Sequence, residues 1–307
     1  MPMNILIPRK SYRKLRSRCK AYQTKIPKIY FSFVFFFIFL SHFVVKFITK
    51  NQAKLQADVK KTDKPKAPKL ISPDDLLNII KPGDRVYIGS GCSEPVVFTE
   101  KLVKEKQWSL SDVQLLHFLK LSKKRLFCEH NPTRFRYNTL SIIGSPEMRK
   151  AVNEGKIDFT PINSSEISRL LKGRRHKIDV ALIQVTPPDK TGHCSLGINV
   201  DINRTVVDVA DTVIAQVNPK MPRTMGNSFI RFMDLDYFLH DERLIEIPNL
   251  EIDETSEKIS EYVARLIENG STINMGLGKI AYSLPNKLLE ADKQDLAFYS
   301  EVLPETI

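Results

Sequence analysis

Short apolar runs alternate along most of the chain with stretches whose apolar positions recur at helical spacing. Apolar runs of about four to eight residues are typical of strands buried on both faces, and helices between them favour parallel connections. The alternation begins near Ile71 and predicts an α/β fold, with an open, mostly parallel sheet and flanking helices. In the first part of this region the expected strands are 85–88, 113–119, 180–185 and 213–217.

A glycine loop follows the first expected strand. Gly89-Ser90-Gly91 comes directly after Ile88, and a helix over 95–106 with a proline in its first turn comes next. Glycine lets the backbone approach a ligand closely, although a plain strand-to-helix corner has the same sequence. Both interpretations stay open at this point. Another helix is predicted at Ser145-Pro146-Glu147, where an N-cap, a first-turn proline and an acidic residue follow one another.

A second unit of the same kind is predicted near the end of the chain. Residues 219–241 are rich in Met, Pro and Arg and have no clear period, which indicates an ordered excursion with a domain boundary near Pro248. Beyond it we expect a helix with Gly270 as its stop, then a strand, a Gly-x-Gly loop, a helix and a last strand. These elements are placed at 255–268, 272–275, 276–278, 279–290 and 296–299.

The first 70 residues have a different composition. Residues 1–28 form a basic leader without acidic residues, 29–48 are largely apolar and rich in Phe, and 49–70 form a linker rich in Lys and Pro. The apolar segment is a candidate transmembrane helix near the lower length limit for crossing a bilayer. A cleaved secretory signal and a mitochondrial presequence are the competing interpretations. We expect a mitochondrial, membrane-anchored protein, with a single-pass membrane protein elsewhere as the alternative.

The distribution of charge argues against a nucleic-acid partner. The chain has a net charge of +12, but residues 1–70 hold 17 of its 47 Lys and Arg and only two of its 35 acidic residues. The globular part that follows is therefore slightly acidic. A basic surface is the electrostatic requirement for binding nucleic acid, so this class of function is excluded for the folded part.

The four cysteines and six histidines do not form a metal motif. Cys19, Cys92, Cys128 and Cys194 are far apart, and no pair has the spacing of zinc ligands. Cys92 lies just after the first glycine loop, but the sequence around it lacks the nucleophile-elbow pattern G-x-nucleophile-x-G. We predict no metal and no thiol nucleophile.

Several long stretches of this sequence resemble one family of enzymes. They are IGSGCSEPVVFTEKL, FRYNTLSIIGSPEMRKAVNEGKIDFTPINSSEI and IQVTPPDKTGHCSLGINVDINRTVVDVADTVIAQVNPKMPRTMGNSFI. The chain is similar, from about 72 to its end, to the acetyl-CoA hydrolase and 4-hydroxybutyrate CoA-transferase branch of the class I CoA-transferases. The resemblance implies an N-terminal domain over 71–247 and the beginning of a C-terminal domain, incomplete here, over 248–307.

The resemblance also implies the site residues. In this family a Gly-x-Gly loop and a strand that ends in the nucleophilic glutamate open the second domain. Ala297-Phe298-Tyr299-Ser300-Glu301-Val302 matches that segment, with Tyr299 in place of a histidine, so the catalytic residue is expected to be Glu301. Gly276 and Gly278 are the expected loop for binding CoA and for stabilising the oxyanion, with Gly89 and Gly91 as a second loop. Candidates for contacts with the CoA phosphates are Arg134, Arg136, Arg149 and Arg223.

A carboxylate nucleophile suits a thioester substrate. The departing CoA thiolate is a weak base that leaves without a general acid, and a glutamate is already ionised at neutral pH. The expected substrate is therefore a coenzyme A thioester, with a small carboxylate as acceptor in a transferase or water in a hydrolase. A homo-oligomer is left open. The alternative function is a non-catalytic family member that serves as a membrane-tethered binding domain.

Overall fold

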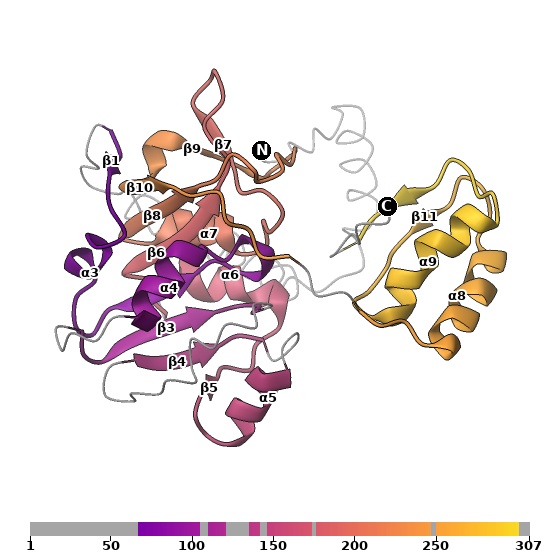
Figure 1. Ribbon diagram of the computed structural model, residues 1–307, viewed down its shortest axis with the longest axis horizontal. Helices are drawn as coiled ribbons and strands as arrows, with labels where there is room; N and C mark the ends of the chain where they lie inside the picture. Colours follow the sequence, from indigo (N-terminus) through magenta and orange to yellow (C-terminus); the bar gives the residue numbers. More distant parts are fainter. Residues whose placement is uncertain are drawn as a thin grey trace, which may run out of the picture. The chain divides into compact units, whose positions relative to one another are not determined.

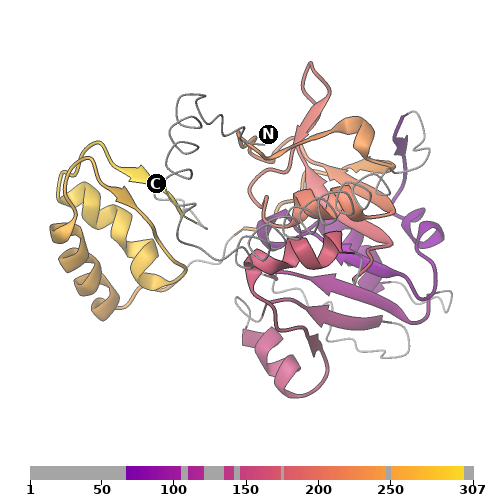
Figure 2. The ribbon, with the colours of Figure 1, turned by 180° about the vertical axis from the view of Figure 1, so that it is seen from behind.

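The structure of the protein is a computed structural model, which describes residues 67–104, 110–120, 135–141, 146–173, 176–246 and 250–300 (Figures 1 and 2). The predicted leader, apolar segment and nearly all of the linker lie outside these residues. Among the residues described, no helix combines the length and the apolar character needed to cross a membrane.

The centre of the fold is an eight-stranded sheet in which every pair of neighbouring strands is parallel. This confirms the predicted open parallel sheet. The order across the sheet is β1-β10-β8-β6-β2-β3-β4-β5. The strands are β1 (Lys69–Leu70), β2 (Arg85–Ile88), β3 (Val113–His117), β4 (Phe135–Thr139), β5 (Asp158–Phe159), β6 (Val180–Val185), β8 (Thr212–Val217) and β10 (Tyr237–His240).

The sheet is doubly wound. From β2 the chain moves outward through β3 and β4 to β5, and it then returns to the other side of β2 and moves outward through β6 and β8 to β10. The direction of winding therefore reverses between β2 and β6. In open α/β sheets this switch point, at the carboxyl ends of the strands, is where ligands bind.

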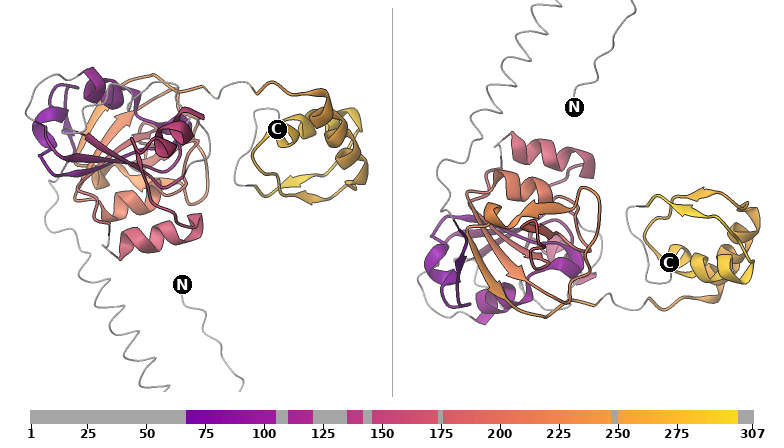
Figure 3. Two further views of the ribbon diagram at one scale, coloured as in Figure 1. Left: turned by 90° about the horizontal axis from the view of Figure 1, so that it is seen from below. Right: turned by 90° about the horizontal axis from the view of Figure 1, so that it is seen from above.

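Helices cover both faces of the sheet, as Figure 3 shows with the sheet seen edge-on. One apolar core lies between the sheet and the first three helices, and a second lies between the sheet and the next two. Central strands such as β6 are buried along their whole length, which is why their sequences are nearly continuous apolar runs. The helices are α3 (Leu76–Ile79), α4 (Val96–Lys104) and α5 (Pro146–Asn153) on one face, and α6 (Ser164–Lys172) and α7 (Asn203–Val209) on the other.

The segment predicted as an excursion without period contains regular structure. β9 (Phe229–Arg231) pairs antiparallel with β7 (His193–Ser195), a short 3₁₀ turn η2 (Phe232–Asp234) follows, and β10 joins the main sheet. The Asp236 carboxylate accepts a hydrogen bond from the Val213 N–H at 2.7 Å and ties the start of β10 to β8. These strands are too short to give a pattern, so only long-range pairing reveals them.

A second α/β module follows, drawn in gold in Figure 1. The Asp253 side chain caps the first helix by accepting from the Ser256 N–H at 2.8 Å, and the two strands pair in parallel. A small apolar core of its own includes Ala264, Ile273 and Leu288. The elements are α8 (Glu254–Leu266), β11 (Thr272–Ile273), α9 (Lys279–Glu290) and β12 (Ala297–Phe298).

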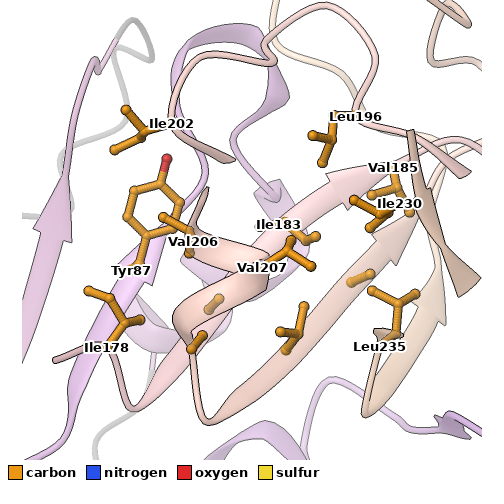
Figure 4. Close-up of a cluster of buried hydrophobic side chains, with 14 of the residues drawn as sticks. Tyr87, Ile178, Ile183, Val185, Leu196, Ile202, Val206, Val207, Ile230 and Leu235 are labelled. Carbon is orange, nitrogen blue, oxygen red and sulfur yellow. The ribbon is translucent and has the colours of Figure 1, made fainter. Parts of the chain in front are cut away.

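The ring of Tyr87 packs among aliphatic side chains in the second apolar core (Figure 4). The residue is fully buried, and its hydroxyl donates to Asn203 Oδ1 at 2.8 Å and lies 3.0 Å from Ser90 Oγ. Burial raises the pKa of this hydroxyl well above its ordinary value, with a smaller contribution from the charge of Asp201. The hydroxyl therefore joins β2, the glycine loop and α7.

Replacing Tyr87 by Phe tests this connection. The change leaves the Asn203 side-chain oxygen without its buried donor, so we expect the free energy of unfolding in urea to fall by about 1–3 kcal/mol. Tyr262→Phe, at an exposed tyrosine on α8, is the matched control and should change it by no more than about 0.5 kcal/mol. Equal effects of the two substitutions would contradict the connecting role of the hydroxyl.

Candidate active site

The first glycine loop is hydrogen-bonded to the chain segments on both sides of β2. The Gly89 N–H donates to the Leu182 carbonyl of β6 at 2.8 Å, and the Gly91 N–H donates to the Leu119 carbonyl beyond β3, also at 2.8 Å. Both glycines are buried. These two N–H groups are therefore engaged within the fold in this structure, at the corner that the chain forms at the switch point.

An asparagine from a distant segment holds this corner. Gly91 has φ +57°, and a Cβ at this position would lie 2.7 Å from the side-chain nitrogen and oxygen of Asn199. Asn199 Oδ1 accepts from the Cys92 N–H at 3.1 Å, and its carbonyl accepts from Asn203 Nδ2 at 2.7 Å. Burial raises the pKa of the Cys92 thiol to about 11, which disfavours the reactive thiolate.

A buried ion pair lies at the carboxyl ends of β2 and β3. Lys120 Nζ is 3.0 and 3.1 Å from the two carboxylate oxygens of Glu94, and both side chains are about 2 % exposed or less. Burial lowers the pKa of Lys120, and Glu94 opposes that shift. Removing one partner of such a pair leaves a buried charge without compensation, at a cost of about 3–5 kcal/mol.

His117, at the end of β3, is buried beside this pair. Neither of its ring nitrogens has a hydrogen-bond partner, and burial together with the charge of Lys120 lowers its pKa well below the ordinary value. Among the described residues, three side chains have buried polar atoms without a partner: His117, Ser93 and Gln184. They belong to β3, to the turn after β2 and to β6, which are adjacent strands around the switch point.

The second glycine loop is open. Gly276 and Gly278 have no atom within 4 Å of the place where a Cβ would stand, and Gly278 has φ +138°. Within the part of the chain that the structure describes, the N–H groups of Gly276, Leu277 and Gly278 form no hydrogen bond. They precede the first turn of α9, where the helix dipole adds partial positive charge. The loop therefore offers donors to an anion.

The strand that precedes Glu301 lies beside this loop. The Tyr299 N–H donates to the Ile273 carbonyl at 3.0 Å, Asn274 Nδ2 donates to the Tyr299 carbonyl at 2.8 Å, and Ser300 Oγ bonds the Met275 carbonyl. Ser300 is thus bonded to Met275, which directly precedes Gly276. Glu301 itself lies outside the described residues.

Several charged side chains considered for the site are engaged with one another. Lys279, the first residue of α9, is 2.9 Å from Asp253 Oδ2, and hydrogen bonds from Lys279 and Ser256 lower the pKa of Asp253 to about 2. Of the arginines considered for CoA, Arg136 pairs with Asp112 and Arg223 pairs with Asp189. Arg149 is exposed on α5, and Arg134 lies outside the described residues. No group of metal-binding side chains occurs among the residues that are described.

A doubly wound parallel sheet with a glycine corner and buried polar groups at its switch point defines an open α/β domain, a class in which ligands commonly bind at the carboxyl edge of the sheet. The model of the acetyl-CoA hydrolase/transferase N-terminal domain matches residues 54–248. The chain therefore belongs to the acetyl-CoA hydrolase/transferase family.

Relatives of established name agree with this assignment. The 4-hydroxybutyrate coenzyme A transferase of Clostridium kluyveri is 34% identical over 240 residues, 78% of this chain and 55% of that protein. The succinyl-CoA:acetate/propanoyl-CoA:succinate CoA transferase of Fasciola hepatica is 30% identical over 237 residues, 76% of this chain and 48% of that protein. The chain thus spans about half the length of the curated relatives it matches.

Solved structures show the same fold. RipA from Yersinia pestis superposes with a TM-score of 0.69 and 24% identity over 78% of this chain and 57% of that one.

Substituting Gly91 by Ala tests the corner. Both the positive φ and the approach to Asn199 oppose a Cβ, so we expect the free energy of unfolding to fall by about 2–4 kcal/mol. Gly83→Ala is the control, because Gly83 has φ +84° with nothing within 4 Å, and should cost only about 1 kcal/mol. Urea denaturation compares them, and equal losses would show that Asn199 does not constrain the corner.

His117 gives a prediction for pH. Its pKa is lowered in the folded protein, so its neutral form contributes stability that is complete above the unfolded pKa of about 6.5 and is lost as pH falls below it. Relative to His117→Leu, the native protein should lose about 1.4 kcal/mol of unfolding free energy per pH unit below that value. His176, Glu94 and Lys120 are present in both proteins and cancel. Parallel stability curves of the two proteins between pH 7.5 and 5.5 would contradict this.

Proposed function

We propose that this chain acts as an acyl-CoA:carboxylate CoA-transferase or an acetyl-CoA hydrolase through a glutamyl-CoA thioester on Glu301. The observation that carries the proposal is the open loop Gly276–Gly278 beside the strand that leads into Glu301, in a chain of this family. The relatives named as CoA transferases support the reaction class.

The proposed first half-reaction balances without an added acid, base or metal. The Glu301 carboxylate attacks the thioester carbonyl, CoA thiolate leaves, and a mixed anhydride forms. The thiolate then attacks the glutamyl carbonyl, which releases the acyl group as a free carboxylate and leaves the enzyme as a glutamyl-CoA thioester. The thiolate is a good leaving group because the pKa of the thiol is near 8.5.

The second half-reaction decides between transferase and hydrolase. An acceptor carboxylate attacks the glutamyl thioester, and the released thiolate then takes the new acyl group from the mixed anhydride, which restores Glu301. Water in place of the acceptor gives Glu301 and free CoA. Both halves place negative charge on carbonyl oxygens, which the N–H groups of Gly276, Leu277 and Gly278 are suited to stabilise.

The two glycine loops have different proposed parts. Gly276 and Gly278 supply donors to the oxyanion and to CoA, whereas Gly89 and Gly91 shape the corner at the switch point of the first domain, because their own N–H groups bond Leu182 of β6 and Leu119 beyond β3. The buried polar atoms of Ser93, His117 and Gln184 lie at the carboxyl ends of adjacent strands, where this fold class binds ligands. A mitochondrial location and a membrane anchor through 29–48 remain predictions.

Intact mass after incubation with acetyl-CoA tests the covalent step. We expect the full chain to gain the mass of one CoA less one water, and Glu301→Ala to gain nothing. Glu290→Gln, at a glutamate of α9 that pairs with Lys287, is the matched control and should form the adduct normally. An adduct that persists in Glu301→Ala would exclude this residue as the nucleophile.

Release of free thiol separates the two activities. Both should return label from free acetate into acetyl-CoA, because the first half-reaction is reversible, but only a hydrolase should release free thiol from acetyl-CoA. Binding of acetyl-CoA without adduct, exchange or thiol release would favour the alternative of a non-catalytic family member.

A further inference from the structure

Two strands of the sheet end in the same unusual way. β6 reads VALIQV and β8 reads TVIAQV, so each has a glutamine at the last position but one of a buried apolar run. Gln184 and Gln216 lie opposite each other in the parallel register, and both are almost completely buried. A buried amide is costly unless it is hydrogen-bonded, so these side chains need partners.

The partner is one backbone carbonyl in the segment after β10. The side-chain nitrogens of Gln184, Gln216 and Asn218 lie 3.1, 3.1 and 3.2 Å from the carbonyl oxygen of Arg243. Gln216 Nε2 also lies 3.3 Å from Asp241 Oδ1, and its amide oxygen accepts from the Val97 N–H at 3.3 Å. Three buried amides from two neighbouring strands and their continuation thus meet at one point of the chain.

The side chain of Arg243 adds a second attachment. Its guanidinium makes paired hydrogen bonds with Asp241 at 2.8–3.0 Å and reaches Glu100 of α4 at 2.8 Å. Its N–H donates to Asp241 Oδ1 at 3.0 Å. Residues 241–246, which have no regular secondary structure, are therefore bonded to β6, β8 and α4. They form the beginning of the segment that leads to the second module.

We propose that Gln184, Gln216 and Asn218 form a latch that holds residues 241–246 on the sheet and fixes the point and direction in which the chain leaves the first domain. Its importance for catalysis rests on the proposed function, because Glu301 belongs to the second module. Chain length is not the main effect, since the entropy of loop closure changes only slowly with the number of residues released. The effect is orientation, to which group transfer between bound partners is sensitive. These are positioning residues.

Amide hydrogen exchange of the full chain tests the latch without any assay of activity. Gln184 is the cleanest position, because its amide nitrogen bonds only Arg243 among the described residues and its amide oxygen has no partner. Gln184→Leu should speed exchange of 241–246 about fivefold, the change expected on losing one ordinary hydrogen bond. The double variant with Gln216→Leu should speed it by more than about twentyfold.

Matched controls make the result specific. Gln114→Leu removes a half-buried glutamine of β3 that bonds Arg85 of β2 and, within the described part of the chain, has no hydrogen bond to residues 241–246, so it should leave their exchange unchanged. Arg231→Lys alters a similar arginine–aspartate pair with Asp234 and should also leave it unchanged, whereas Arg243→Lys should speed it. Unchanged exchange in the double variant, or acceleration spread evenly through β6 and β8, would overturn the latch.

Measurements of turnover then distinguish a failure of the positioning role from a failure of the proposed function. If the native chain forms the Glu301 adduct, the double variant should lower kcat about tenfold or more with little change in KM for acyl-CoA, and an unchanged kcat would overturn the positioning role. If the native chain forms no adduct, the proposed function fails, while the exchange result still decides whether the latch exists.

Discussion

The pairing of β2 with β6 is the constraint on which the first domain depends. Every backbone N–H and carbonyl in a sheet buried on both faces must find a partner, so the strands can be ordered only where continuous ladders form. The ladder between these two strands continues past β2 into the glycine loop, through the Gly89 N–H and the Leu182 carbonyl. This contact places the reversal of winding, and the glycine corner, at the centre of the sheet.

The polar residues of the first domain follow from that placement. The corner leaves little space for side chains, which is why Gly91 packs against Asn199. The polar groups near it are buried. Most of them find partners, as Glu94 and Lys120 do. The polar atoms that have no partner belong to adjacent strands around the reversal of winding. A stable protein tolerates such groups where a ligand or a bound water satisfies them. The arrangement therefore supports a ligand-binding role for this edge of the sheet.

In the proposed mechanism the first domain and the second module have different roles. The first supplies a rigid sheet whose buried amides hold the start of the connecting segment through Arg243. The second supplies an open glycine loop before α9 and, beside it, the strand that leads into Glu301. A carboxylate nucleophile needs neither a triad nor a metal, so such a site leaves few marks in a sequence beyond its glycines and one acidic residue.

The class of fold can be derived from the sequence, because short apolar runs separated by helical periodicity are a local property of the chain. The sequence also placed β2, β3, β6 and β8, the glycine loops and the second module, and its long motifs pointed to the family that the comparisons established. The strand order, the strands β4, β5 and β10, and the hydrogen bonds of the Gly89 and Gly91 N–H groups are seen only in the folded protein. The folded protein also shows what Gln184 and Gln216 bind. Both β6 and β8 end in Gln-Val, but the hydrophobic pattern of the sequence does not indicate why. The physical reason is that these features depend on hydrogen bonds between segments far apart in the chain, which no local pattern encodes.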